Sequence, residues 1–308
     1  MEYRRLGKSE LQVSAVGLGT WQFGGEWGKD FSPEEVCDLV ARAKSLDINL
    51  IDTAECYGDH LSESLVGQAI KGQRDYWIVA TKFGHHYHGH LQRTEHWNVR
   101  IVLAQLEDSL RALHTDYIDL YQFHSGEDAV FDQQELWTML DKQVRAGKIR
   151  HLGNSIGDQR ASYQVSRSFE VGVSVIQAVY NRLDRSVEET ILKQAQKLDL
   201  GILAREPLAN GLLSGKYPPG ATAAVVNDWR SAAWPTDVWQ ERLREVDRIR
   251  RAELPEDAQL APWALAWVLK HPAVGAVIPG CKSIAQLESN AAAVDLVQST
   301  KGLPRCSS

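Results

Sequence analysis

The chain has 308 residues, of which 44% are apolar and 24% charged, so it is long enough to bury one large core. Its formal net charge of −6 disfavours nucleic acid as a partner, because proteins that neutralise phosphate backbones concentrate Lys and Arg. No apolar run reaches the roughly 20 residues that cross a bilayer, and the N-terminal segment lacks the apolar stretch of a signal peptide. We therefore expect a cytoplasmic protein without a membrane association.

Short β-branched, apolar segments alternate with helical patterns along the chain, which predicts βαβ units and a parallel sheet. Eight strands are expected, at residues 13–20, 49–54, 76–83, 117–124, 149–155, 175–181, 201–208 and 274–280. Helices are expected at 33–46, 61–70, 98–113, 133–146, 159–168, 188–198 and 284–293. The first helix should begin after Ser32, because Ser-Pro-Glu-Glu provides an N-cap, a first-turn proline and acidic residues near the positive end of the helix dipole. Together these elements predict one (β/α)8 TIM-barrel domain over residues 1–308.

Two segments depart from the alternation. The first dozen residues alternate around a Gly-Lys-Ser turn, which predicts an N-terminal hairpin that closes the bottom of the barrel. The stretch from about 209 to 272 is too long for one crossover and carries two helical patterns, at 239–252 and 258–270. We expect it to be an insertion after the seventh strand, lying above the barrel.

Polar residues close several of the predicted strands, where barrel enzymes carry their reactive groups. Asp52 lies in the second strand, Tyr57 follows it, Lys82 is near the end of the third and His124 closes the fourth. Reduction of a carbonyl needs a proton donor, and a tyrosine becomes a better acid when a cation stabilises its phenolate. Lys82 could be that cation, Asp52 could hold it, and His124 could orient the carbonyl.

Each of these residues also fits a structural role when it is taken alone. An Asp in an apolar strand often forms a structural ion pair, a loop Tyr often packs its ring, and a single His is often a core residue. Their positions at the ends of three consecutive predicted strands favour a common site.

The segment NLIDTAECYGDHLSESLVGQAI resembles the signature of the aldo-keto reductase family, in which an Asp precedes a Tyr by five residues and a Gly follows. The resemblance continues through VATKFG, DLYQFH, VIQAVYN, AREPLANGLLSGKY and VIPGCKSIAQLESN, and so spans nearly the whole chain. It implies that the catalytic tetrad falls on Asp52, Tyr57, Lys82 and His124. The implied reaction is reduction of a small aldehyde or ketone with a nicotinamide cofactor, preferably NADPH, in which Tyr57 is the general acid.

The resemblance also implies a cofactor site without a glycine-rich dinucleotide fingerprint, and the chain has no GxGxxG between a strand and a helix. Residues expected near the nicotinamide are Thr20, Trp21, Asp52, Ser155, Gln177 and Arg205. Arg205 stands where many members have a stacking Tyr, and its planar guanidinium could stack there as well. Ile156 replaces an amide residue of the family pattern, so the carboxamide is expected to contact Ser155, Gln177 and Asn154.

The phosphates and the adenine are expected at the last two strands. The pyrophosphate should lie at Pro207, Leu208, Gly211, Ser214 and Lys216, with Arg230 reaching over it. The adenosine 2′-phosphate should lie at Gly280, Lys282, Ser283 and Gln286, at the start of a helix, with Asn290 contacting the adenine. Gln286 replaces an Arg of many NADPH-dependent members, so the preference for NADPH should be modest and NADH remains possible.

The substrate pocket is expected to be lined by Trp21, Tyr57, Phe83, Tyr87 and His124. Five of the ten histidines lie between residues 85 and 96, and clustered imidazoles can bind zinc. No carboxylate or thiolate at a recognised ligand spacing accompanies them, so a long loop that walls the pocket is favoured and no metal is expected. Cys56 beside Tyr57 suggests a redox switch, but a packing role is favoured.

Two alternatives to a carbonyl reductase fit the same residues. One is an NAD-linked sugar or polyol dehydrogenase that runs the same chemistry in the oxidative direction. The other is a cofactor-sensing regulatory subunit, because the family resemblance extends to the β-subunits of potassium channels. A retained tetrad favours an enzyme.

Overall fold

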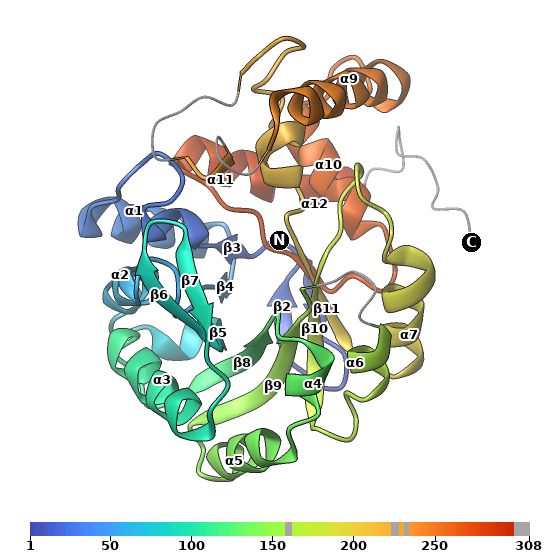
Figure 1. Ribbon diagram of the computed structural model, residues 1–308. Coiled ribbons are helices and arrows are strands. Elements are labelled where there is room, and N and C mark those ends of the chain that lie inside the picture. Colours follow the sequence, from blue (N-terminus) through green and yellow to red (C-terminus); the bar gives the residue numbers. More distant parts are fainter. Residues whose placement is uncertain (158–161, 223–227, 231–233, 299–308) are drawn as a thin grey trace.

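The computed structural model describes residues 1–157, 162–222, 228–230 and 234–298. Its centre is a parallel sheet of eight strands in the order β12-β11-β10-β9-β8-β5-β4-β3 (Figure 1). These are β3 (Leu18–Gly19), β4 (Leu50–Asp52), β5 (Ile78–Phe83), β8 (Ile118–His124), β9 (Ile149–Ser155), β10 (Val173–Val179), β11 (Gly201–Arg205) and β12 (Ala276–Val277). Parallel bridges from Val16 to Val277 and from Gly19 to Gly280 join the first strand to the last. The predicted (β/α)8 barrel is confirmed.

Helices surround the sheet (Figure 1). They are α1 (Pro33–Ser45), α2 (Leu61–Ala69), α3 (Val99–Ala112), α5 (Gln134–Arg145), α6 (Ser162–Ser166), α7 (Lys193–Lys197), α10 (Leu260–Leu269), α11 (Ile284–Ala291) and α12 (Ala293–Gln298). A π-helical turn, η3 (Glu188–Leu192), precedes α7, and together they form the helix predicted at 188–198. Of the helix predicted at 159–168, residues 159–161 lie outside the described residues. Among the described helices none is both long and apolar enough to span a membrane.

Helix α1 begins where its sequence predicts. The Ser32 side chain accepts a hydrogen bond from the Glu35 amide, and the Glu35 side chain accepts one from the Ser32 amide. This reciprocal capping box satisfies two backbone donors that the first turn would otherwise leave free.

The predicted first strand, 13–20, is wrong in one respect, because it belongs to two different sheets. Its beginning is β2 (Gln12–Ser14), which pairs antiparallel with β1 (Tyr3–Arg5) in the expected N-terminal hairpin. The Ala15 amide still donates to the Glu2 carbonyl at 2.9 Å, while the Ala15 carbonyl accepts from the Val277 amide of β12, so the chain passes from one sheet to the other at this residue. The hairpin closes the barrel, since its Leu6 and Val13 are fully buried in a cluster with barrel residues Leu50, Ala80, Leu120, Val175, Leu203 and Ala276.

The segment after β11 also differs from the prediction. Helix α10 is buried along nearly its whole length and packs on α11 and α12, so it is the crossover helix that leads to β12 and does not lie above the barrel. Only the preceding part is an insertion, which holds η4 (Ala209–Ser214) and α9 (Thr236–Glu253). Helix α9 buries Trp239, Leu243, Val246 and Ile249, the apolar side of its helical pattern.

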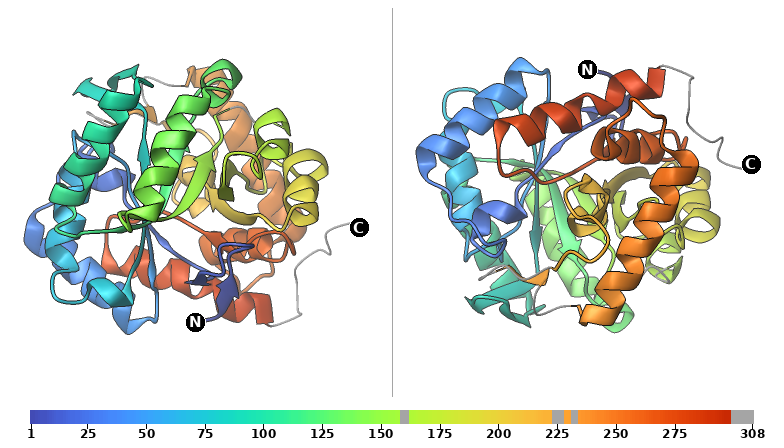
Figure 2. Two further views of the ribbon diagram at one scale, coloured as in Figure 1. Left: turned by 90° about the horizontal axis from the view of Figure 1, so that it is seen from below. Right: turned by 90° about the horizontal axis from the view of Figure 1, so that it is seen from above.

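The His-rich segment forms a hairpin instead of the expected loop. Strand β6 (His85–Gly89) pairs antiparallel with β7 (Gln92–Glu95) directly after β5. Figure 2 shows this hairpin and the N-terminal hairpin at opposite ends of the barrel. The β6–β7 hairpin therefore lies at the carboxyl ends of the strands, where barrel sites are built.

Candidate active site

A cavity of about 640 Å³ opens at the carboxyl ends of the barrel strands. Nearly all the residues that the sequence assigned to a site line it: Thr20, Trp21, Asp52, Tyr57, Lys82, His124, Ser155, Gln177, Arg205, Pro207, Leu208, Gly211, Ser214, Lys216, Arg230, Gly280, Lys282, Gln286 and Asn290. The cavity is thus continuous from the four candidate catalytic residues to the candidate phosphate-binding residues.

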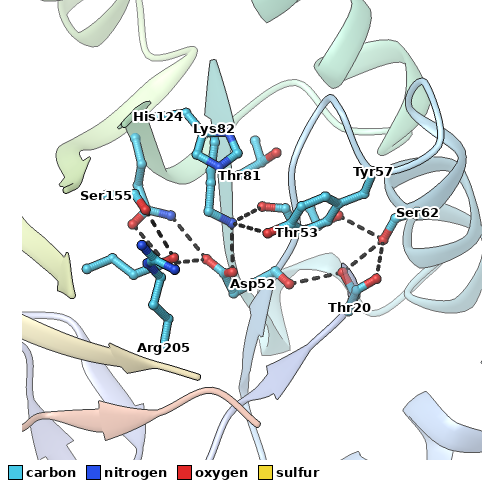
Figure 3. A network of polar contacts seen from close by, with 12 residues as sticks. Thr20, Asp52, Thr53, Tyr57, Ser62, Thr81, Lys82, His124, Ser155 and Arg205 are labelled. Carbon is cyan, nitrogen blue, oxygen red and sulfur yellow. Dashed lines mark hydrogen bonds and ion pairs between the residues drawn. The ribbon is translucent and has the colours of Figure 1, made fainter. Parts of the chain in front are cut away.

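Lys82 is the centre of a network of polar contacts on the wall of the cavity (Figure 3). Its side chain is 1% exposed, and its Nζ donates to Asp52 Oδ1 at 2.8 Å, to the Thr53 carbonyl at 2.7 Å and to the Tyr57 hydroxyl at 3.3 Å. A buried ammonium is stable only when its charge and all its protons find partners, and these three acceptors provide them.

The second carboxylate oxygen of Asp52 is held from the other side of the barrel. Asp52 Oδ2 accepts hydrogen bonds from Gln122 Nε2 at 3.1 Å and from Gln177 Nε2 at 2.7 Å. The Ser155 hydroxyl in turn donates to Gln177 Oε1 at 3.3 Å. A chain of polar contacts therefore runs from Ser155 to Tyr57 and fixes the orientation of the Asp52 carboxylate.

Burial and charge act in opposite directions on these groups. Burial raises the pKa of Tyr57 to about 12, although the Lys82 ammonium alone would lower it. Burial lowers the pKa of Lys82, but the hydrogen bonds and charges of Asp52 and Tyr57 raise it by more, so it lies above the ordinary value. Burial and nearby cations hold the pKa of His124 well below its usual range, so its imidazole is neutral at neutral pH. Lys82 therefore lowers the pKa of the phenol as expected, but burial outweighs it.

The loop that carries Tyr57 is tied to the end of β3 and the start of α2. The Ser62 hydroxyl donates to Thr20 and accepts from the Thr53 hydroxyl at 3.0 Å (Figure 3). Gly24 packs against the same loop, where an added Cβ would lie 2.7 Å from the Tyr57 carbonyl carbon. These contacts hold the loop in place and so fix the position of the Tyr57 hydroxyl relative to Lys82.

Two tryptophans, Trp21 and Trp27, line the cavity, and a third, Trp229, packs on both of them. Trp21 stacks on Tyr57 with ring centroids 5.9 Å apart and on Trp229 at 5.2 Å. Trp27 meets Trp21 edge to face and forms an antiparallel bridge with Asp228 from the insertion. The insertion therefore contacts the loop after β3 across the mouth of the cavity.

Three positively charged side chains line the part of the cavity formed by the segments after β11 and β12. Lys216, Arg230 and Lys282 all line it, and burial together with these neighbouring charges lowers the pKa of Lys282. Asp228 compensates only part of this charge: it pairs with Arg230 and is 4.0 Å from Lys282 Nζ. Such an accumulation of positive charge suits an anionic ligand.

Four residues lie elsewhere than predicted. Phe83 is fully buried between the sheet and the outer helices, because strand neighbours face opposite sides and Lys82 faces inward. Asn154 likewise faces outward and donates to Gln164. Tyr87 is not among the residues that line the cavity, since it lies on the β6–β7 hairpin. Ser283 instead caps α11 by accepting from the Gln286 amide.

Several cavity residues were missed by sequence reasoning. His85 and Arg93 line the cavity because the His-rich segment folds back as a hairpin, and the alternation of its polar residues was the available signal. Cys56 also lines the cavity. Trp27 reaches the site through its bridge to Asp228, for which the local sequence carries no signal.

The chain is similar to known proteins over nearly its whole length. A sequence model described as the Aldo/keto reductase family matches residues 15–308. Aldo-keto reductase YhdN of Bacillus subtilis is 32% identical over 297 residues, which cover 94% of this chain and 87% of the relative. An NADH-specific methylglyoxal reductase of Escherichia coli is 28% identical over 316 residues, with 94% and 93% covered. The solved glycerol dehydrogenase AKR11B4 from Gluconobacter oxydans matches with a TM-score of 0.80, 28% identity, and 100% and 98% covered. The chain belongs to the aldo/keto reductase family, whose members are NAD(P)H-dependent oxidoreductases.

Proposed function

We propose that this enzyme reduces the carbonyl group of a small aldehyde or ketone to an alcohol, with NADPH as the preferred cofactor and Tyr57 as the proton donor. The observation that carries the proposal is the position of the Tyr57 hydroxyl, 3.3 Å from a buried Lys82 ammonium and on the wall of a 640 Å³ cavity. A protonated phenol beside a fixed cation can give up its proton when negative charge develops on a carbonyl oxygen.

Each of the four residues then has one task. Tyr57 donates the proton, Lys82 stabilises the phenolate that remains, and Asp52 holds Lys82 in place at 2.8 Å. His124, neutral because burial lowers its pKa, donates a hydrogen bond to the substrate oxygen without competing as an acid. Trp21, stacked on Tyr57, forms an apolar wall beside the reacting carbonyl.

The cavity residues fit a dinucleotide cofactor. Two buried polar atoms on its wall, Gln22 Oε1 and Arg205 Nε, have no hydrogen-bond partner among the described residues. Gly211 adopts a φ of 92°, a conformation that favours glycine, and it places its backbone close to the Arg230 guanidinium on the cavity wall. Bound reduced nicotinamide would supply the hydride that the protein itself lacks.

Distinct groups of residues would hold the parts of the cofactor. Ser155 and Gln177 would hold the carboxamide, with Arg205 against the ring. The loop of Pro207, Leu208, Gly211, Ser214 and Lys216 would hold the pyrophosphate under Arg230. Lys282 would pair with a 2′-phosphate and Asn290 would contact the adenine. Ser283 would serve this end of the site only indirectly, because its hydroxyl caps α11.

The choice of NADPH rests on a single cation. The Gln286 side chain accepts from the Lys282 amide at 2.8 Å, and so occupies a backbone donor that could otherwise bind phosphate. Lys282 would then contribute most to the discrimination between NADPH and NADH. One charged hydrogen bond of about 1.5–3 kcal/mol gives a roughly ten- to hundredfold preference for NADPH. NADH would also be accepted, as the name of the Escherichia coli relative indicates for that protein.

Polyol oxidation with NAD is a second candidate, favoured by the likeness to glycerol dehydrogenase over the whole chain. In that direction Tyr57 would act as a base, which requires its phenolate. Because burial raises the pKa of Tyr57 to about 12, its protonated form, which is the form that carbonyl reduction needs, predominates at neutral pH.

A panel of short aldehydes, ketones and polyols separates the two candidates. Methylglyoxal and glycerol belong in it, and each is tested with both cofactors through the absorbance of the reduced nicotinamide. We expect at least one aldehyde to be reduced at neutral pH with a higher kcat/KM for NADPH than for NADH. Oxidation of polyols without reduction of any carbonyl would contradict the proposal.

A further inference from the structure

Four side chains with metal-binding atoms meet beside the cavity. Glu55 and Cys56 follow β4, His85 begins β6, and His124 ends β8. One ligand atom of each lies within 4.8 Å of those of the other three. Cys56 Sγ is 4.0 Å from His85 Nδ1 and 3.9 Å from His124 Nδ1, and Glu55 Oε1 is 3.8 Å from His124 Nδ1.

The donor set is that of a tetrahedral zinc-type ion. Two imidazole nitrogens, one sulfur and one carboxylate oxygen are all common zinc ligands. Zinc bonds of about 2.0–2.3 Å in a tetrahedron place ligand atoms roughly 3.3–3.8 Å apart, so ligand atoms that now lie within 4.8 Å of one another need to approach by at most about 1.5 Å. The rings of His85 and His124 are already stacked, with centroids 4.3 Å apart and planes at 23°.

Glu55 is the feature that the proposed reaction leaves unexplained. It is 2% exposed, and its Oε2 atom has no hydrogen-bond partner among the described residues. Its other oxygen accepts from the His85 amide at 2.9 Å, and the 3.8 Å to His124 Nδ1 is too long for a hydrogen bond. A buried carboxylate oxygen without a partner is costly, and a cation would satisfy it.

The charges of the cluster also balance with a divalent ion. Coordination displaces the proton of the Cys56 thiol to solvent, and the resulting thiolate with the Glu55 carboxylate neutralises two positive charges. Both imidazoles bind as neutral ligands. The Arg93 guanidinium, which donates to the Cys56 carbonyl at 3.2 Å, therefore faces a neutral site once the ion is bound.

We propose that Glu55, Cys56, His85 and His124 form a binding site for a zinc-class divalent ion at the edge of the active site. No metal was expected from the sequence, because the ligands come from three different strand ends and share no linear spacing. Of the five histidines in the His-rich segment only His85 takes part. One consequence rests on the proposed function: an ion on His124 draws the imidazole toward Cys56 and away from the substrate carbonyl, and so inhibits reduction reversibly.

Cobalt binding tests the site without any substrate. Metal-free protein is titrated with Co²⁺, which substitutes for zinc and gives a thiolate-to-cobalt charge-transfer absorption when sulfur is a ligand. We expect this absorption to saturate at one ion per chain and to disappear when Zn²⁺ is added. Cys56→Ser should abolish it, and His85→Gln should weaken Co²⁺ binding at least tenfold. His86→Gln, which changes the exposed neighbour of His85 on the same hairpin, is the matched control and should bind as the parent chain does.

Three results would overturn the site: no charge-transfer absorption in the parent chain, an absorption that persists in Cys56→Ser, or binding that is lost in His86→Gln. If Cys56→Ser does not fold, the titrations of the parent chain and of the two histidine variants still test the metal site. Inhibition of NADPH oxidation by Zn²⁺, with recovery on adding a chelator, is measured separately. Because the titration needs no turnover, failure of the metal site and failure of the proposed reaction are distinguishable.

Discussion

Lys82 and Asp52 form a buried ion pair whose members cannot be changed independently. The pair is nearly fully buried, and removing one partner leaves the other as an uncompensated charge, which typically costs about 3–5 kcal/mol. The third acceptor of Lys82 is the Tyr57 hydroxyl, so the pair is coupled directly to the candidate proton donor. The electrostatics of the site therefore depend on this one ammonium.

Replacing Lys82 by Met should lower the rate of carbonyl reduction by about 10²-fold or more, because no cation then stabilises the phenolate. It should also raise the pKa of Tyr57 further, since Lys82 is the group that lowers it. The pH dependence of alcohol oxidation, which needs the phenolate, should therefore shift to higher pH. Rates in both directions are measured against pH, with circular dichroism as the control for folding. An unchanged pH profile in a folded variant would remove Lys82 from this role.

Replacing Lys282 by Ala should weaken NADPH binding by about tenfold or more and leave NADH binding nearly unchanged, because only NADPH carries the 2′-phosphate with which this charge would pair. Intrinsic tryptophan fluorescence can follow both titrations, since Trp21 and Trp27 line the cavity. Lys29→Ala is the matched control: this neighbouring lysine donates to the Lys282 carbonyl and pairs with Glu35. Equal losses for both cofactors would mean that Lys282 contacts a group that they share.

The position of a single residue could be predicted where the alternation of a strand defines the direction of its side chain. Asp52, Tyr57, Lys82 and His124 were found because polar residues at strand ends are rare in an apolar pattern. Phe83 shows the limit, because the inward direction of Lys82 already requires its neighbour to face outward. The cluster around Glu55 could not be predicted, since its contacts depend on how three strand ends are spaced in the folded barrel.

At the level of elements, a boundary could be predicted where a local chemical signal marks it. The capping box at Ser32 fixed the start of α1, whereas the predicted first strand began too early because the mostly small and apolar residues of 13–20 carry no signal that separates β2 from β3. Helix α10 was assigned to the insertion because its position relative to the sheet depends on packing against α11 and α12. Apolar residues on all its faces were the available sign of a buried helix.

The junction of β3, β4 and α2 is expected to position Tyr57. Ser62→Ala removes the hydroxyl that links Thr20 with Thr53, which should cost about 1–3 kcal/mol of stability because buried polar partners are left unsatisfied. It should also reduce kcat more than it raises the Kd of NADPH, because the loop that carries Tyr57 loosens. Ser64→Ala, two residues further along α2 and partly exposed, is the control. Urea unfolding and steady-state kinetics measure both effects, and equal behaviour of the two variants would exclude this positioning role.

In the whole molecule, the residues that close the barrel and those that line the cavity lie at opposite ends of the barrel axis. The β1–β2 hairpin lies at one end of the barrel, and the β6–β7 hairpin and the insertion lie at the other (Figure 2). The apolar cluster closes the first end, and the cavity opens at the second. The alternation of strands and helices predicted this architecture because each βα unit has a local signature. The bridge between Trp27 and Asp228, which brings the insertion across the cavity, could not be predicted because these two residues lie far apart in the sequence and neither belongs to a strand.

The central claim is that Tyr57 protonates the carbonyl oxygen, and the variant Tyr57→Phe tests it most directly. Steady-state reduction of the best aldehyde is measured for the parent chain, for Tyr57→Phe and for Tyr87→Phe, a control on the hairpin outside the cavity lining. Turnover should fall by about 10²–10⁴-fold in Tyr57→Phe, because only the proton donor is lost, while NADPH affinity stays nearly unchanged. Tyr87→Phe should retain turnover. Near-normal turnover in Tyr57→Phe would contradict the account.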